Sequence, residues 1–208
     1  MIKEKVYAGD SDFIGRKLCL DFSNTVGMHA SDNPRENLNT YNDLVKWSLQ
    51  ARILSEDDAR KLIRMATKKP SESEKVLRRA VRLREAIYRI FSSVAAHSPL
   101  KKEDLVLINQ NLSKTMASSQ LIPVETGFIW DIKKNKGELD WMLNQIVRSA
   151  ADLLTSDELK RVRMCADDRG CGWLFLDASR NRSRRWCDMK DCGNRAKARR
   201  FYKKTKKK

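Results

Sequence analysis

The stretch that decides the fold is residues 165–200, CADDRGCGWLFLDASRNRSRRWCDMKDCGNRAKARR. It holds two short-spaced cysteine pairs, Cys165 with Cys171 and Cys187 with Cys192. Structural zinc takes four deprotonated ligands in a tetrahedron, and two cysteine pairs separated by an insert of hairpin length supply that geometry. Two disulfides are the alternative, but close pairs in a chain without a secretory leader favour a metal. We therefore predict one structural zinc ion per chain, held by these four residues.

The residues between and after the cysteine pairs predict a zinc finger of treble-clef type. We expect a strand over 173–177, a turn over 178–183 and a returning strand over 184–187, with a helix after Asn194 as its N-cap. A module of fewer than about 40 residues buries too little surface to fold alone. Structural zinc contributes on the order of 10–16 kcal/mol of apparent binding free energy. Folding of this segment should therefore require the metal.

The positive charge of the chain is concentrated in the same segment. The 208 residues carry a formal net charge of +16, and residues 161–208 account for +12 of it. Four thiolates and Zn²⁺ together contribute about −2, so the folded module stays strongly positive. Solvated charge that aids solubility is the alternative, but this density favours a polyanion partner. The candidate phosphate-binding residues are Arg180, Arg182, Arg184, Arg185, Arg195, Lys197, Arg199, Arg200, Lys203 and Lys204.

The pattern of these cations favours phosphate contacts over base reading. A helix that follows Asn194 would be basic on nearly all of its faces, which suits positioning on the phosphate backbone rather than selective contact with base edges. Trp173, Phe175 and Trp186 lie among the cations. They would either stack on unpaired bases or form the small core of the finger, and the second use is the more common.

Residues 1–160 predict a mainly α-helical body with one small β-hairpin. Thr40, Ser55 with Asp58, and Ser71 with Glu74 have the pattern of helix N-caps, the last two as capping boxes. In the third helix, apolar residues recur at three- and four-residue steps until Pro99. Further helices are expected over 101–118, 139–154 and 156–164, the last running directly into Cys165. A change of period around Gly127 predicts a hairpin over 121–132, and residues 17–26 fit either a buried strand or a helix.

Arg84 suggests a polar pocket inside the body. It lies at the edge of the apolar stripe of the third helix, and a buried guanidinium needs an anion. Asp21 is the leading candidate, ahead of Glu85 and of a bound ligand, and a structurally paired arginine is the simpler alternative. The candidate pocket for a small-molecule or anionic effector comprises Asp21, Asn24, Thr25, Arg35 and Arg84.

Catalysis and membrane insertion find little support in the sequence. The histidines, His29 and His97, are far apart and have no evident nucleophile beside them, and no phosphate-binding glycine pattern occurs. We therefore do not expect an enzyme. No apolar run is long enough to span a membrane, and the start MIKEKVYAGD lacks the apolar core of a leader, so we expect a cytoplasmic protein without a membrane partner.

Several segments resemble known families. Residues 171–177 (CGWLFLD), 179–187 (SRNRSRRWC) and 192–200 (CGNRAKARR) resemble the CGNR zinc finger. Residues 15–26 (GRKLCLDFSNTV) and 83–91 (LREAIYRIF) are similar to the ABATE domain, which normally precedes that finger. The resemblance implies a bacterial, cytoplasmic, stress-induced transcriptional regulator with the four cysteines as zinc ligands. The five-residue gap between Cys165 and Cys171 departs from the usual four.

We thus expect an ABATE-like helical body over 1–160 and a CGNR-type zinc finger with a basic C-terminal tail over 161–208. The finger should bind duplex DNA, while the body senses an effector or forms a homodimer. A continuous helix into Cys165 would relay changes between them. An RNA- or ribosome-associated module is one alternative, and a small-molecule-binding protein or enzyme with an accessory finger is the other.

Overall fold

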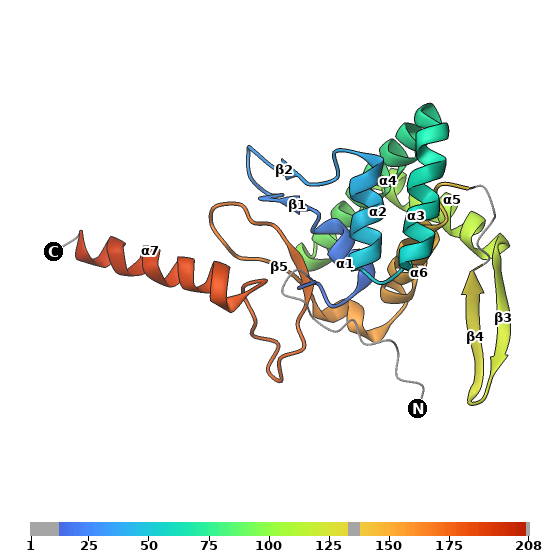
Figure 1. The fold of residues 1–208 in the computed structure, drawn as a ribbon. Helices are drawn as coiled ribbons and strands as arrows, with labels where there is room; N and C mark the ends of the chain where they lie inside the picture. The colour runs from blue at the N-terminus through green and yellow to red at the C-terminus, as the bar shows by residue number, and fades with distance from the viewer. Residues whose placement is uncertain (1–12, 133–137, 207–208) are drawn as a thin grey trace.

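The helix α4 (Pro70–Ala96) is the central element of the body in the computed structural model, which describes residues 13–132 and 138–206 (Figure 1). Its buried side chains recur every three or four residues, from Val76 through Leu83 and Ile87 to Phe91. The apolar period therefore predicted the core helix correctly. The other body helices are α1 (Leu18–Ser23), α2 (Tyr41–Gln50), α3 (Glu56–Lys68), α5 (Lys102–Ala117) and α6 (Met142–Leu154).

Two helices begin at the capping residues that the sequence predicted, and a third begins at a different residue. Thr40 begins α2, and Ser55 with Asp58 forms the capping box of α3. The predicted box of Ser71 with Glu74 is wrong, because α4 already begins at Pro70 and has no side-chain cap. Proline suits the first turn of a helix, where its missing N–H would have no partner, so the helix starts one residue before Ser71.

The ambiguous segment over 17–26 is mainly helical. All six residues of α1 are buried, and α1 packs between α4 and α6. A helix enclosed on both sides is buried all round, which is why its sequence lacks the one-sided apolar period of a surface helix. A short antiparallel pair follows it, β1 (Val26–Gly27) with β2 (Arg35–Glu36).

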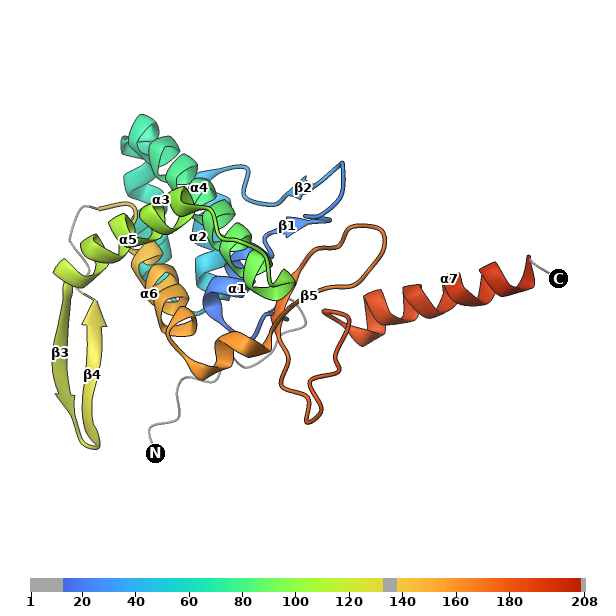
Figure 2. The ribbon, with the colours of Figure 1, turned by 180° about the vertical axis from the view of Figure 1, so that it is seen from behind.

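The predicted hairpin is present and projects from the end of α5 in both views (Figures 1 and 2). The guanidinium carbon of Arg148 in α6 lies 4.6 Å from the centre of the Trp130 ring of the hairpin. Strands β3 (Ser119–Val124) and β4 (Gly127–Ile132) pair antiparallel, with Leu121 opposite Trp130. Gly127 has φ 135°, a conformation that side chains rarely adopt, as its place after the turn predicted.

The expected helix over 156–164 is wrong. Residues Asp157–Arg161 form a 3₁₀ helix, η1, and Val162–Met164 form the strand β5. β5 pairs antiparallel with β6 (Leu174–Leu176), so Val162 lies opposite Leu176. In this pairing the side chain of Val162 is buried in the core of the body, a tertiary contact that the helical pattern of 157–164 did not reveal. The junction is therefore a strand pair, and no continuous helix enters Cys165.

The returning strand over 184–187 is also wrong. The carbonyl of Arg185 accepts from the backbone N–H of Ala166 at 2.9 Å, and the N–H of Arg184 donates to the Asp177 carboxylate at 3.0 Å. These groups are thus unavailable for a ladder with β6. The chain continues through a π-type turn, η2 (Met189–Gly193), into α7 (Asn194–Thr205). Asn194 is the first residue of that helix rather than its N-cap, which is Gly193.

Candidate metal centre and nucleic-acid interface

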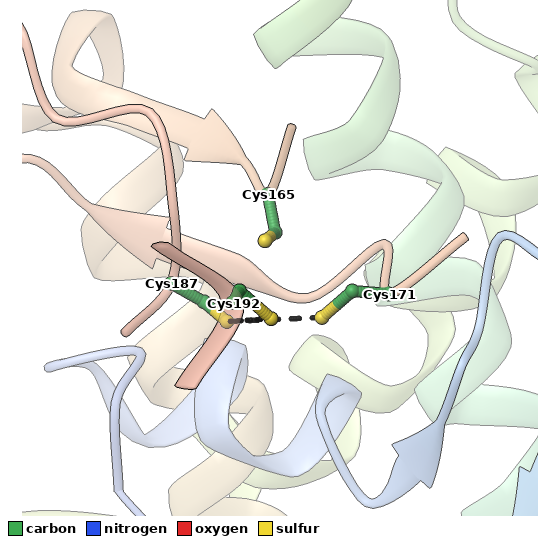
Figure 3. Close-up of side chains that lie close together, drawn as sticks. All are labelled: Cys165, Cys171, Cys187 and Cys192. Carbon is green, nitrogen blue, oxygen red and sulfur yellow. Dashed lines mark hydrogen bonds between the residues drawn. The ribbon is translucent and has the colours of Figure 1, made fainter. Parts of the chain in front are cut away.

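Four cysteine thiols meet beside β5, β6 and the turn before α7 (Figure 3). The Sγ atoms of Cys165, Cys171, Cys187 and Cys192 all lie within 4.8 Å of one another, and all four residues are buried. The Sγ of Cys187 is 3.7 Å from that of Cys171 and 3.7 Å from that of Cys192. Sulfur atoms bound at about 2.3 Å to a tetrahedral Zn²⁺ are about 3.8 Å apart. The four thiols therefore fit one structural zinc ion, as the sequence predicted.

The crowding of these thiols explains why they require a cation. Hydrogen bonding with Cys165 and Cys171, followed by burial, raises the pKa of Cys187. Burial raises the pKa of Cys192, and the nearby charges of Cys171 and Cys165 add to that effect. Thiolates this close repel one another unless a metal compensates their charge, and zinc binding deprotonates thiols outright. With four sulfur ligands the site leaves no position for water, so its role is structural.

The first cysteine pair lies on a tight turn built with glycine. The backbone N–H of Cys165 donates to the carbonyl of Trp173 at 2.8 Å, closing the turn. Gly172 has φ 67°, in the left-handed region that favours glycine. A Cβ at Gly172 would lie 2.7 Å from the Cβ of Ala30. The backbone N–H of His29 also donates to the carbonyl of Cys171 at 3.0 Å, so the turn is packed directly on the body.

The second cysteine pair is held by Arg184. Its Nε donates to the carbonyl of Trp186 at 3.0 Å, and its Nη2 donates to the carbonyl of Cys187. The guanidinium carbon lies 4.4 Å from the centre of the Phe175 ring. Burial lowers the pKa of Arg184. The side chain therefore serves the interior of the finger in this structure.

The ten predicted phosphate-binding residues fall into two groups. Arg184 is bonded within the finger, as are Arg195, which pairs with Asp191, and Arg199, which pairs with Asp167 and Asp168. The other seven are exposed and form no ion pair with any residue in the described ranges. These seven are Arg180, Arg182, Arg185, Lys197, Arg200, Lys203 and Lys204.

The pairing of Arg199 attaches α7 to the first cysteine turn. Burial alone would raise the pKa of Asp167, but hydrogen bonds from Arg169 and Arg199 lower it to about 2. Asp167 is thus an anionic anchor near the base of α7. Beyond that anchor the helix buries none of its residues and extends away from the body (Figures 1 and 2).

The aromatic residues of the finger also fall into a buried group and an exposed group. Phe175 is fully buried, and Trp173 and Trp186 pack against its cluster, which confirms the core interpretation for them. Phe201 and Tyr202 on α7 are each 65% exposed. They are the aromatic side chains of the finger that lie open to solvent, and sequence patterns did not single them out for contact with bases.

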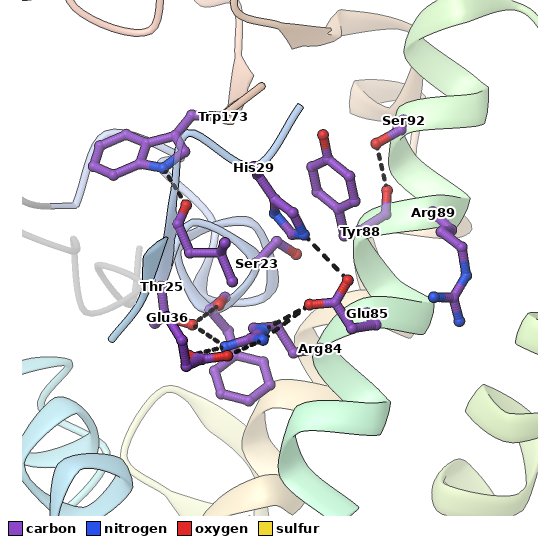
Figure 4. Close-up of polar contacts among 12 residues, drawn as sticks. Ser23, Thr25, His29, Glu36, Arg84, Glu85, Tyr88, Arg89, Ser92 and Trp173 are labelled. Atoms are coloured by element: carbon purple, nitrogen blue, oxygen red, sulfur yellow. Dashed lines mark hydrogen bonds and ion pairs between the residues drawn. The ribbon is translucent and has the colours of Figure 1, made fainter. Parts of the chain in front are cut away.

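The buried side chain of Arg84 is the centre of a charge network whose carboxylates are partly exposed (Figure 4). The residue is 2% exposed, and its Nη1 and Nη2 donate to the two carboxylate oxygens of Glu36 at 2.6 Å each. Its Nε and Nη2 also donate to Oε1 of Glu85, at 3.0 and 2.9 Å. His29 Nε2 lies 3.1 Å from Oε2 of Glu85, which extends the network to the loop that contacts the finger.

The expectation that Asp21 pairs with Arg84 is wrong. The partners are Glu85, which the sequence offered as an alternative to Asp21, and Glu36. β2 carries Glu36 to Arg84 by pairing with β1, and no pattern within one helix reveals that partner. Asp21 instead accepts from the backbone N–H of Gly15 at 2.7 Å. Asp21, Asn24 and Thr25 line one cavity, while Arg35 is exposed. Arg84 lies outside the cavity lining and donates to Thr25 Oγ1 at 3.3 Å.

Both histidines belong to the helical body, one in a side-chain stack and one at a helix end. His29 stacks on Tyr88 with ring centres 3.5 Å apart, in addition to its contact with Glu85. His97 ends α4 in a left-handed conformation, with φ 52°. No helix in the described part of the chain is both long and apolar enough to cross a bilayer.

Fold and metal centre together define a helical zinc-finger protein. Residues 16–157 match the family model named ABATE, whose description is "Putative stress-induced transcription regulator", and residues 161–205 match the CGNR zinc finger. The chain therefore belongs to the ABATE family and carries a CGNR zinc finger, as the sequence resemblance predicted. Both families are of regulator or zinc-finger type rather than enzyme type. A search of curated proteins found no match.

Proposed function

We propose that this protein is a cytoplasmic bacterial transcriptional regulator that binds duplex DNA through α7 and the loop over 178–186. The observation that carries the proposal is α7 itself, whose twelve residues include six cations and no acidic residue and bury no side chain. A helix that carries four exposed cations without an ion pair to any described residue, held on a metal-stabilised base, is suited to a polyanion. The family description supports the regulatory role, while DNA as the partner rests on this charge distribution.

One face of α7 is free for the contact. Residues three, four and seven apart share a helix face, so Lys197, Arg200 and Lys204 lie together. Arg199 is turned toward its partner Asp167, on the side of α7 nearly opposite to that face. The free face therefore points away from the cysteine turn. An α-helix about 10–12 Å across also fits the major groove, which is about 12 Å wide.

The contacts are assigned to phosphates. The seven exposed cations lie on the loop and on α7, and long flexible side chains around a helix reach the backbone on both sides of a groove. In this arrangement Arg184 and Arg199 position the surface, and the exposed residues carry the charge that meets the DNA.

Binding of a labelled random-sequence duplex by fluorescence anisotropy tests the proposal. The variant Lys197→Ala/Arg200→Ala/Lys204→Ala removes the free face of α7 and should weaken binding at least about tenfold. The matched control, Lys61→Ala/Arg64→Ala/Lys68→Ala, removes three exposed cations with identical spacing from α3 and should bind like the wild type. Equal affinities of the two variants would reject the α7 surface.

Competition separates DNA from RNA. Unlabelled duplex DNA should displace the labelled duplex more effectively than single-stranded RNA of equal length. The exposed Phe201 and Tyr202 provide surfaces on which unpaired bases could stack, so stronger competition by the RNA would replace the DNA assignment with an RNA one.

A further inference from the structure

A cavity of about 380 Å³ lies between the body and the finger, apart from the zinc centre and the nucleic-acid surface. Asp21, Asn24 and Thr25, at and just after the end of α1, form one side of it. Trp47 of α2 and Trp173 of the finger contribute aromatic walls. Cavities that bind small molecules measure roughly 300–1,000 Å³ and combine apolar walls with a few polar groups, as this one does.

One polar atom at this cavity is left without a partner. Asp21 is 3% exposed, and its Oδ1 accepts from the backbone N–H of Gly15 at 2.7 Å. Its Oδ2 is buried and has no hydrogen-bond partner among the described residues. Burial raises the pKa of Asp21 to about 7. A buried carboxylate oxygen without a donor is costly, and such groups are uncommon in folded proteins.

The neighbouring polar side chains at this cavity do have hydrogen-bond partners. Asn24 donates from Nδ2 to the carbonyl of Leu174 at 2.9 Å and accepts from its N–H at 2.8 Å. The hydroxyl of Thr25 donates to the carbonyl of Phe22 at 2.8 Å. Of the three residues from this turn, Asp21 alone keeps a buried oxygen free. That oxygen therefore lacks a donor among the residues that the structure describes, and a ligand that displaces the cavity wall at Asp21 would supply one.

We infer that this cavity binds a small organic cation, a protonated primary amine whose ammonium group donates to Asp21 Oδ2 and whose apolar part packs against Trp47 and Trp173. The indole rings favour a cation as well as an apolar body. Asp43 and Lys46 also line the cavity, so its two carboxyl groups exceed its one ammonium group and a monocation balances them. The inference does not depend on the finger binding DNA.

The occupant would contact both parts of the molecule at once. Trp173 donates from its Nε1 to the carbonyl of Val26 at 2.8 Å, as Figure 4 shows, and it lies two residues after the zinc ligand Cys171. The backbone of its neighbour Leu174 is hydrogen-bonded to Asn24, which also lines the cavity. A bound amine thus rests on the residues by which the finger is attached to the body, which is where an effector can act on it.

Ligand-observed NMR and calorimetry on the full zinc-loaded chain test the site. The probe is 2-phenylethylamine, with 2-phenylethanol and phenylacetate as its neutral and anionic counterparts. The amine should bind at least tenfold more tightly than either counterpart, although the chain has a net charge of +16 that disfavours any unspecific binding of cations. Binding of the alcohol as tight as that of the amine, or no binding of the amine at 10 mM, would overturn the inference.

Two further measurements locate the site. Asp21→Asn should lower the affinity for the amine at least tenfold, whereas Asp32→Asn, which changes an exposed carboxylate outside the cavity, should leave it unchanged. In the wild type the amine should shift the indole N–H signals of Trp47 and Trp173 but not that of Trp186, so the result holds even if the Asp21 variant fails to fold. Shifts confined to tryptophans outside the cavity would reject it.

Discussion

The body and the finger fill their interiors by different chemistry. The body encloses one cluster of aliphatic and aromatic side chains, to which α1 to α6 all contribute. The buried cluster of the finger consists of the four cysteines and Phe175. The strands β5 and β6 belong to the finger, but their residues Val162, Leu174 and Leu176 are part of the cluster of the body. The first half of the finger is therefore anchored by apolar packing and the second half by the metal.

The strongest test of this difference removes one zinc ligand from the second pair. Cys187→Ser should abolish stoichiometric zinc binding, which contributes on the order of 10–16 kcal/mol of apparent binding free energy at such sites. Residues 178–206 should then exchange their amide hydrogens rapidly, while α4, β5 and β6 stay protected, as hydrogen-exchange mass spectrometry can show.

The fifth cysteine gives the matched control. Cys19 is fully buried in the body and lies outside the metal cluster, so Cys19→Ala should keep one zinc per chain. Retention of full zinc binding by Cys187→Ser, or loss of protection in α4, would show that the two interiors are not built as described.

Within the body, the charge network of Arg84 should be the most sensitive polar element. Arg84→Ala removes the charged hydrogen bonds to Glu36 and Glu85, whose side chains are 35% and 31% exposed, and should lower the free energy of unfolding by about 2–3 kcal/mol. Urea unfolding followed by circular dichroism measures this. Arg82→Ala, an exposed site on the same helix, should change stability by less than about 0.5 kcal/mol. A loss below about 1 kcal/mol for Arg84→Ala would mean that the pair does not hold the body together.

The free energy of unfolding should also depend on pH through Asp21, but not through the hydrogen-bonded polar groups around it. Burial raises the pKa of this carboxyl from 3.8 to about 7, so both folded and unfolded chains are protonated below about pH 4. Between about pH 4 and 7 the unfolded chain loses this proton while the folded one keeps it, so stability falls over this window and levels off above pH 7. The wild type should therefore lose up to about 4 kcal/mol of stability relative to Asp21→Asn between pH 4 and 8.

Unfolding free energies of the two proteins at several pH values between these limits check the expectation. Ionisations elsewhere in the chain affect both proteins alike and cancel in the difference. A difference that stays constant with pH would show that Asp21 is not a desolvated carboxyl.

Sequence patterns correctly predicted the features that depend on the spacing of apolar residues or on the kind of metal ligand. The helices of the body followed from apolar spacing, and the zinc ligands followed from the spacing of the cysteines, because tetrahedral zinc needs four such groups close together. Residues 157–164 were misassigned because their side chains fit a helix, and only pairing with β6 reveals a strand.

The candidate sites show the same limit. Arg84 was correctly placed inside the body, but its partner Glu36 comes from a short strand 48 residues earlier, and no sequence pattern links the two. The cavity beside Asp21 likewise depends on Trp173 of the finger meeting Trp47 of α2, which is a tertiary contact. Periodicity shows which face of an element is buried and does not show what lies against that face.

The salt dependence of DNA binding tests the central claim most directly. If all seven exposed cations contact phosphate, log K should fall with log salt concentration with a slope of about −6. Lys197→Ala/Arg200→Ala/Lys204→Ala should reduce the slope to about −4, whereas Lys61→Ala/Arg64→Ala/Lys68→Ala should keep it near −6. A wild-type slope close to zero, or the same change of slope in both variants, would contradict a DNA-binding surface formed by the exposed cations of the finger.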